Sequence, residues 1–165
     1  MKKLSVVLVC LVISVLIPFP INAQNSVFEK LSGSWKGNGI VSGMEAAIEM
    51  KWESVLAGKF YRLSFKNDMK SKNGTIVFEG TAFYKLKTAA ETEGNWFDSF
   101  GFIRPIKAKI EADKLISNWG SQEVEEGKTI YHLIEADKLE VVDSVKTKEG
   151  TWREFGRSIL SRTKD

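Results

Sequence analysis

Residue types that commonly do chemistry in proteins are sparse in this sequence. His132 is the only histidine and Cys10 is the only cysteine. A serine-histidine-acid arrangement would have to combine His132 with Asp98 or Asp143, and no serine lies in a Gly-x-Ser-x-Gly turn. A phosphate-binding loop, a dinucleotide-binding fingerprint and a paired metal-ligand motif are also missing from the sequence. We therefore predict that the protein is not an enzyme; the alternative is a hydrolase-like enzyme that uses His132 with a carboxylate.

Asp98 is the acidic residue whose surroundings most suggest a role in binding. It lies between Trp96 and Phe100 on the same face of an expected strand. A carboxylate in such a position is either exposed at a rim or buried with a partner. The sequence leaves both positions open.

Aromatic side chains, rather than charges, occupy most positions that are expected to face an interior. The residues predicted to line a ligand pocket are Met50, Trp52, Tyr61, Phe65, Phe78, Tyr84, Trp96, Asp98, Trp119 and His132. A barrel of about ten strands is wide enough to enclose a small ligand. The same rings could instead fill the interior completely. The sequence is compatible with either a hollow barrel or a filled one.

The elements that would position these side chains are strands, because the dominant period from Gly33 onward is two. Ile48, Met50 and Trp52 alternate with charged residues, and the same alternation recurs over 61–66 and 106–111. About ten strands are expected, near residues 34–42, 46–55, 60–68, 75–87, 93–100, 103–111, 114–121, 128–135, 138–146 and 151–162.

Short polar turns are expected to join these strands. Asn73-Gly74 is the strongest turn signal, since a type I′ hairpin needs positive φ at both central positions. The segment 110–115 returns as 134–139, and each copy has Ala-Asp-Lys between two apolar ends. The repeat therefore predicts consecutive hairpins of a meander.

One short helix is expected before the first strand. Asn25 or Ser26 can cap it, and Gly33 can end it. Phe28 and Leu31 share one of its faces. Many strands with short connections leave unpaired sheet edges unless the sheet closes. The predicted fold is therefore all-β, a single antiparallel up-and-down meander β-barrel of about ten strands with a short N-terminal helical turn.

Residues 1–23 have the features of a secretory signal peptide. Two lysines precede an apolar run over 4–17, and Ala23 follows two prolines that break the run. The run has 14 residues, fewer than the roughly 20 that span a bilayer as a helix. We therefore predict an exported protein, periplasmic or secreted, with no membrane span after signal cleavage and one β-barrel domain over 24–165.

The charge balance of the mature chain argues against a nucleic-acid partner. Lys2 and Lys3 leave with the signal peptide, so 22 basic residues remain against 21 acidic ones. The two signs interleave along the same stretches, whereas nucleic-acid binders concentrate positive charge on one face. Cys10 leaves as well, so the mature chain has no disulfide and no cysteine metal ligand. The sequence makes no prediction of the oligomeric state.

The expected first strand contains Gly33-x-Trp35-x-Gly37-x-Gly39. Alternation places Trp35 and the last two glycines on one face. Glycine packs no side chain against its neighbours. Two glycines on one face therefore indicate either a sharp bend in the wall or space inside it.

This combination of features resembles the calycin superfamily, which contains the lipocalins and fatty-acid-binding proteins. The shared features are the helical turn, Gly33-x-Trp35 at the start of the first strand, the meander, and an arginine near the end of the last strand. The additional Gly37 and Gly39 are similar to those of nitrobindin-like barrels, which have ten strands. Segments 55–60, 78–80 and 95–99 resemble exported bacterial lipocalin-like domains of unknown function.

The resemblance implies roles for a few residues. In lipocalins the signature tryptophan closes one end of the barrel and packs against the late arginine. Trp35 is therefore expected to contact Arg162, with Arg157 as the second choice. Nitrobindin-like proteins hold haem through a histidine late in the chain, whereas His132 lies in the eighth expected strand and no histidine follows it. We therefore predict no metal and no cofactor, with haem as the alternative that the resemblance leaves open.

The predicted function is that of an exported lipocalin-like protein that binds or carries a small apolar or aromatic molecule in the barrel interior. This hypothesis expects a cavity of several hundred Å³. The first alternative is an envelope-associated interaction protein with a filled barrel and no small-molecule ligand. The enzyme alternative expects His132 and a carboxylate within hydrogen-bond reach in a cavity.

Overall fold

The computed structural model describes residues 27–123 and 125–164. The predicted signal peptide, residues 1–23, lies outside the described residues, and so does the predicted helix cap at Asn25 or Ser26. Within the described ranges, no helix is both long and apolar enough to cross a membrane. Export and the domain boundary at residue 24 therefore stay predictions.

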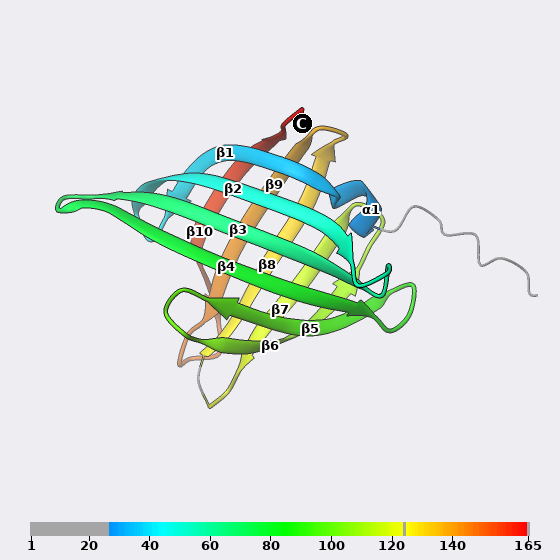
Figure 1. Ribbon diagram of the computed structural model, residues 1–165. Coiled ribbons are helices and arrows are strands. Elements are labelled where there is room, and N and C mark those ends of the chain that lie inside the picture. Colours follow the sequence, from blue (N-terminus) through cyan, green and yellow to red (C-terminus); the bar gives the residue numbers. More distant parts are fainter. Residues whose placement is uncertain (1–26, 124, 165) are drawn as a thin grey trace, which may run out of the picture.

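In this part of the chain, ten antiparallel strands form one closed barrel behind a short helix (Figure 1). The elements are α1 (Val27–Leu31), β1 (Gly33–Val41), β2 (Met44–Val55), β3 (Phe60–Ser71), β4 (Gly74–Leu86), β5 (Glu91–Asp98), β6 (Ile103–Ile110), β7 (Lys114–Ser121), β8 (Glu125–Glu135), β9 (Lys138–Lys146) and β10 (Trp152–Arg162). Each strand pairs with its neighbours in sequence, and β1 pairs with β10 to close the sheet. The predicted all-β meander barrel is therefore confirmed.

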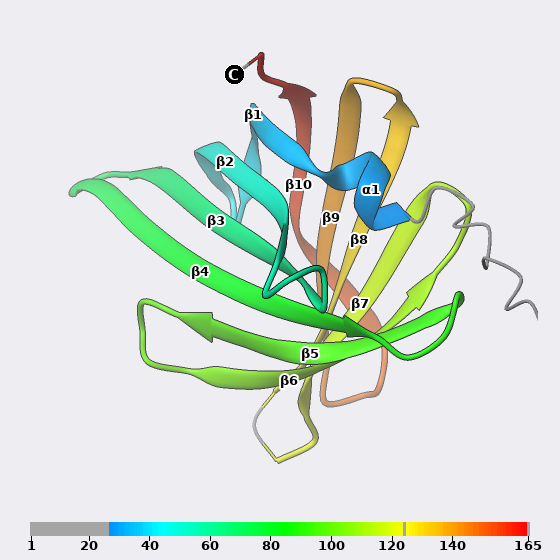
Figure 2. The ribbon, with the colours of Figure 1, turned by 45° about the vertical axis from the view of Figure 1, so that its right-hand side comes forward.

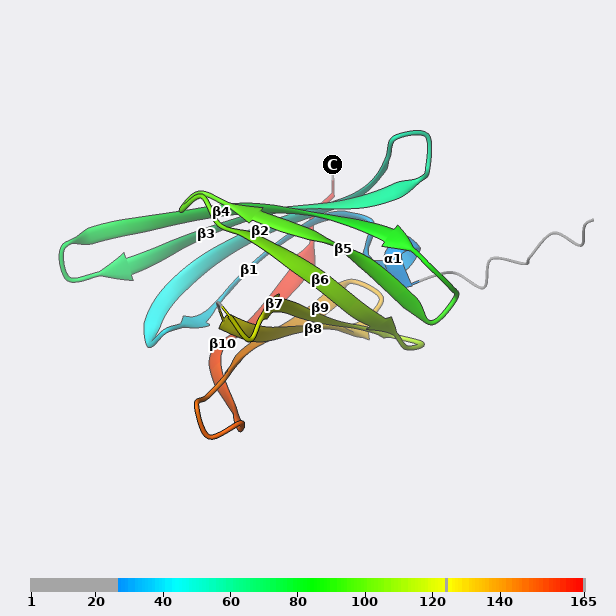
Figure 3. The ribbon, with the colours of Figure 1, turned by 90° about the horizontal axis from the view of Figure 1, so that it is seen from below.

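The two ends of the barrel differ. Figure 2 shows α1 lying across one end. At the other end the β3–β4 hairpin reaches past the neighbouring strands (Figure 3). Along β2 the buried residues Ile48, Met50 and Trp52 alternate with exposed or half-buried ones, as expected. Inward-facing side chains can therefore be assigned to the α1 end or to the hairpin end.

The end of the barrel next to α1 is solid. Phe28 enters from α1, and its ring stacks on that of Tyr61 with the centroids 4.6 Å apart. The rings of Trp52 and Tyr84 lie 5.9 and 5.5 Å from the same ring. Full burial of an aromatic side chain stabilises a fold by about 1.5–3 kcal/mol. The short helix therefore acts as a plug whose stability comes from the rings around Phe28.

Trp35 is fully buried beside this plug and has the contacts that the resemblance implied. Its indole Nε1 donates a hydrogen bond to the carbonyl of Leu31 at 2.7 Å. The guanidinium carbon of Arg162 lies 4.2 Å from the centre of the Trp35 ring. Arg162 also donates to the backbone carbonyls of Lys30 and Ser32. Arg162 therefore ties the last strand to the helix and to the signature tryptophan.

Arg162→Met is expected to lower the free energy of unfolding by about 2 kcal/mol, because it removes the cation above Trp35 and leaves carbonyls without a donor. Urea denaturation followed by far-UV circular dichroism measures the change. Arg157→Met is the matched control, since Arg157 lies on the exposed outer face and pairs there with Glu140 and Glu154. Equal losses in the two variants would contradict a special role for Arg162.

Gly37 and Gly39 lie where β1 passes close to the backbone of β10. A Cβ atom at Gly37 would lie 2.1 Å from the carbonyl oxygen of Ile159, and one at Gly39 would lie 2.3 Å from that of Arg157. β1 therefore approaches β10 too closely for a side chain at either position. Neither glycine therefore leaves open space inside the wall, and the interpretation of the two glycines as a bend stays a prediction.

The hairpin with the strongest turn signal has a different register from the prediction. β3 ends at Ser71 and β4 begins at Gly74, so 72–73 are the loop residues, and neither has positive φ. The predicted type I′ turn centred on Asn73-Gly74 is therefore wrong. Positive φ at both central positions occurs in the β1–β2 turn instead, at Ser42 (50°) and at the glycine after it (77°).

Candidate functional site

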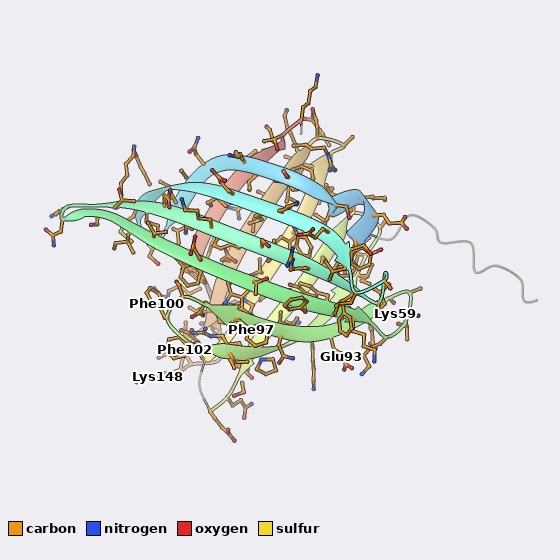
Figure 4. All side chains as sticks on the ribbon, in the orientation of Figure 1. Lys59, Glu93, Phe97, Phe100, Phe102 and Lys148 are labelled. Carbon is orange, nitrogen blue, oxygen red and sulfur yellow. The ribbon has the colours of Figure 1, made fainter. Side chains whose placement is uncertain are left out.

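The barrel is hollow at the end away from α1, where it encloses a cavity of about 300 Å³. Its walls are formed by Val41, Ser42, Ile48, Met50, Phe65, Asn67, Met69, Phe78, Trp96, Asp98, Phe100, Arg104, Trp119, Glu125, Thr129, Tyr131, Val141, Asp143, Phe155 and Ser158. Figure 4 shows Phe100 and Phe102 at the β5–β6 turn, at the opposite end of the molecule from Lys59. Because Phe100 lines the cavity and is 64% exposed, this turn forms part of the cavity mouth.

Six of the ten predicted pocket residues lie on this wall: Met50, Phe65, Phe78, Trp96, Asp98 and Trp119. Trp52, Tyr61 and Tyr84 also point inward as expected, but they pack around Phe28 in the solid end. Only part of the predicted lining therefore faces the cavity.

His132 does not face the interior. Thr129 and Tyr131 are buried on β8, so alternation directs His132 outward. Its Nε2 lies 3.4 Å from Asp113 and its Nδ1 lies 3.7 Å from Glu140 on the outer side of the wall. The expectation that His132 lines the pocket is wrong. The enzyme alternative, which required His132 and a carboxylate in a cavity, loses its geometric basis.

The described residues offer little for a metal or haem. Within residues 27–123 and 125–164, no three His, Cys, Asp or Glu side chains gather closely enough to hold a metal ion. His132 is the only histidine of the sequence, and its outward position prevents it from ligating iron inside the cavity. The absence of a cofactor stays a prediction.

Two tryptophans are set into the cavity wall against glycines of neighbouring strands. A Cβ atom at Gly80 would lie 2.1 Å from the ring of Trp96, and one at Gly127 would lie 2.0 Å from the ring of Trp119. Any larger residue at either glycine would therefore displace an indole from the wall. In the sequence these glycines are only isolated interruptions of strand patterns, so the pairing of each with a tryptophan was missed.

Asp98 is buried at the cavity mouth, where four donors surround it. Its Oδ2 accepts hydrogen bonds from Nη1 of Arg104 at 2.6 Å and from Nε1 of Trp96 at 3.2 Å. Its Oδ1 accepts from the backbone N–H groups of Phe100 and Phe102 at 3.0 and 3.2 Å. The side chains of Asp98 and Arg104 are 1% and 15% exposed. Asp98 is therefore the buried acid with a partner, and it holds the β5–β6 turn in place.

Asp143, on β9, is a second acid of the cavity wall. Its Oδ1 accepts a hydrogen bond from Oγ1 of Thr129 at 2.6 Å, and this hydroxyl accepts one from Nε1 of Trp119 at 3.1 Å. Burial raises the pKa of Asp143 to about 6, although the Thr129 hydrogen bond opposes this and the charge of Glu154 adds to it. The sequence had suggested Asp143 for catalysis, as a partner for a histidine or for Asp98, and not as a pocket residue, so its place in the cavity was missed.

Asp143→Asn is expected to stabilise the folded protein at neutral pH. The pKa of this carboxyl is about 6 in the folded protein against 3.8 ordinarily, so the folded state holds the proton more tightly than the unfolded chain. As the pH rises from about 4 to about 6, the free energy of unfolding of the wild type should therefore fall by about 2–3 kcal/mol relative to that of the variant. Urea denaturation of both proteins at about pH 4 and pH 7.5 measures this. A gain of equal size at both pH values would contradict the assignment.

Phe155 and Asn67 are two of the wall residues that were not predicted. Phe155 reaches the cavity because β10 has a register irregularity between Glu154 and Gly156, which changes the inward and outward alternation. Asn67 is 3% exposed, and its Oδ1 has no hydrogen-bond partner in the part of the chain described. Its alternation with Phe65 on β3 could have placed it, whereas nothing in the sequence marks the irregularity in β10.

Solved structures with a similar barrel cover most of this chain. The S-type phycobiliprotein lyase CPES from Guillardia theta matches with a TM-score of 0.59 and 14% identity, over 86% of this chain and 95% of that one. Rv2717c from M. tuberculosis matches with a TM-score of 0.64 and 12% identity, over 82% of this chain and 94% of that one. No protein-family model and no curated protein matches the sequence. At these identities the likeness is one of fold, that of a closed antiparallel β-barrel like the ten-stranded one seen in this chain.

Proposed function

We propose that this protein binds or carries a small apolar or aromatic molecule in the cavity at the open end of the barrel. The proposal rests on one observation, a cavity of about 300 Å³ whose walls carry seven aromatic side chains, inside a barrel that α1 plugs at the other end. A preformed cavity of this kind binds a ligand mainly by removing apolar surface from water, at roughly 25 cal/mol per Å². The rings that supply the surface are those of Phe65, Phe78, Trp96, Phe100, Trp119, Tyr131 and Phe155.

The filled-barrel alternative has less support. The rings around Phe28 fill the interior next to α1, but they leave the opposite end hollow. An interaction protein that binds its partner through the rim would not need glycines at positions 80 and 127, where they make room for the rings of Trp96 and Trp119 in the cavity wall. The hollow end therefore favours a small-molecule ligand over a partner bound only to the outer surface.

Export is part of the same proposal. Its support is the sequence of residues 1–23, together with the resemblance to exported bacterial lipocalin-like domains. The resemblance to nitrobindin-like barrels concerns the ten-stranded fold and not the location. Intact-mass measurement of protein recovered from expressing cells is expected to give a chain that begins at Gln24. A chain that keeps residues 1–23 in the cytoplasmic fraction would argue against export and leave the binding proposal untouched.

Ser158→Phe tests whether the cavity binds ligands. Ser158 is 4% exposed and lines the cavity, so a phenyl ring at this position extends into the space. The neutral dye N-phenylnaphthylamine becomes more fluorescent in apolar surroundings, and it is expected to bind the wild type. The variant is expected to bind it at least about tenfold more weakly. Ile159→Phe is the matched control, because the next side chain on β10 is 44% exposed on the outer face.

Circular dichroism first verifies that both variants keep the barrel. Equal binding by Ser158→Phe and the wild type would place the dye outside the cavity. Failure of the wild type to bind any neutral aromatic dye would reject the proposed function.

A further inference from the structure

The charged groups of the cavity wall are unequally matched. Asp98, Glu125 and Asp143 share the wall with one guanidinium, that of Arg104. Nη1 of Arg104 lies 2.6 Å from Asp98, and Nη2 lies 3.9 Å from Glu125. The positive charge of Arg104 is therefore already met by neighbouring carboxylates. Asp143 is the acid of the wall that lacks a cationic partner among the described residues.

One oxygen of Asp143 is committed and the other is open. Oδ1 accepts the hydrogen bond of Thr129, whereas Oδ2 receives none from the described part of the chain. Gly156 lies beside this oxygen on β10, where a Cβ atom would stand 3.1 Å from Oδ2. Because glycine has no side chain, Oδ2 is not covered from this direction, and Asp143 itself lines the cavity.

The surroundings of this open oxygen are aromatic. Trp119 is tied to Asp143 through the hydroxyl of Thr129, and Tyr131 and Phe155 line the same space. Aromatic faces attract cations, and a buried carboxylate is strongly disfavoured unless a proton or a cation neutralises it. A ligand that brings a positive charge and apolar rings would satisfy both features at once.

We propose that the ligand is an aromatic cation whose protonated amine donates a hydrogen bond to Oδ2 of Asp143 while its rings lie against the aromatic wall. This inference rests on the proposed function and adds the charge and the size of the ligand. A cavity of about 150 Å³ accommodates one benzene molecule, so the observed 300 Å³ encloses about two rings, and the third ring of a dye such as N-phenylnaphthylamine would lie at the mouth beside Phe100. An anionic ligand would add a fourth negative charge to a wall whose one guanidinium is already paired.

The inference carries a pH dependence of known sign. The pKa of Asp143 is about 6 in the unliganded protein, so the carboxyl is mostly ionised at about pH 7.5 and mostly protonated at about pH 5. An alkylammonium group stays protonated over this range, and its affinity should fall as the pH falls. Other titratable groups facing Asp143 or sharing its cavity are Glu125 and Tyr131 of β8, Glu154 of β10, Tyr84 of β4, Asp98 of β5 and Arg104 of β6. The Asp143→Asn variant separates its titration from theirs.

Competition against N-phenylnaphthylamine measures the preference with three naphthalenes of similar size: naphthylmethylamine, naphthylmethanol and naphthoate. At about pH 7.5 the wild type is expected to bind the amine at least about tenfold more tightly than the alcohol, and naphthoate most weakly. Asp143→Asn should remove the preference for the amine and keep the affinity for the alcohol, because the amide has the shape of the acid and still accepts from Thr129. Lowering the pH to about 5 should weaken binding of the amine to the wild type but not to Asp143→Asn.

Glu140→Gln is the matched control, because Glu140 is an acid of the same strand as Asp143 but pairs with Arg157 on the outer face of the barrel. This variant is expected to keep the preference for the amine. Equal binding of the three compounds, or tighter binding of naphthoate, would overturn the inference. Binding of the alcohol in the same experiment would still support the proposed function. Failure of the alcohol and the dye to bind would reject the proposed function itself.

Discussion

Replacing Asp98 by asparagine is expected to lower the free energy of unfolding by about 3–5 kcal/mol. The carboxylate is 1% exposed and accepts four hydrogen bonds, from Trp96, Arg104 and two backbone N–H groups. Asparagine would turn an N–H toward at least one of these donors. Arg104, which is 15% exposed, would also keep its charge without the carboxylate that neutralises it. Urea denaturation at about pH 7.5 measures the loss.

Glu49→Gln is the control for this substitution. Glu49 pairs with Lys36 at 3.0 Å, but both side chains are more than half exposed on the outer face. Removal of such a pair changes stability little. A loss in Asp98→Asn no larger than that in Glu49→Gln would show that the hydrogen bonds at the mouth do not stabilise the barrel.

The same substitution should loosen the cavity mouth. Oδ1 of Asp98 holds the backbone N–H groups of Phe100 and Phe102, and these bonds fix the β5–β6 turn. Hydrogen exchange of the two amides is therefore expected to be faster in Asp98→Asn, whereas amides of the distant β2–β3 turn around Lys59 should change less. Asp98 thus connects the stability of the fold to the shape of the cavity opening.

The strands could be predicted because a barrel wall with one dry and one wet face leaves a period of two in the sequence. On β2 the pattern is unambiguous, since Ile48 and Met50 face inward and the residue between them is charged. On β8 it is not. Ile130 and Ile134 lie on the outer face with His132, so both faces carry apolar side chains and alternation cannot decide between them. The wrong placement of His132 follows from this ambiguity.

The position of a side chain along the barrel axis, by contrast, cannot be read from the period of the sequence. Trp52 and Met50 point to the same interior, yet one belongs to the solid end and the other to the cavity wall. The difference arises because α1 inserts Phe28 at one end and leaves the other open. A period of two reports which face a residue occupies, but it does not report which layer of the interior is filled. The extent of the cavity therefore required the structure.

Phe28→Ala should be among the most destabilising substitutions in the chain, at about 3–5 kcal/mol, because Phe28 is 0% exposed and its ring touches those of Trp52, Tyr61 and Tyr84. Phe78→Ala removes the same atoms from the cavity wall. Phe78→Ala should lower the free energy of unfolding by only about 1 kcal/mol, because a ring that faces the cavity makes fewer contacts with other side chains. Urea denaturation of the two variants measures the difference.

Ligand binding should reverse the order of these two variants. Phe78→Ala removes part of the aromatic wall, so N-phenylnaphthylamine is expected to bind it several-fold more weakly. Phe28→Ala should keep the affinity of the wild type in its folded fraction, because the plug lies outside the cavity lining. Equal destabilisation by the two substitutions, or a loss of dye affinity in Phe28→Ala alone, would mean that the interior is not divided into a solid end that stabilises the barrel and a hollow end that binds.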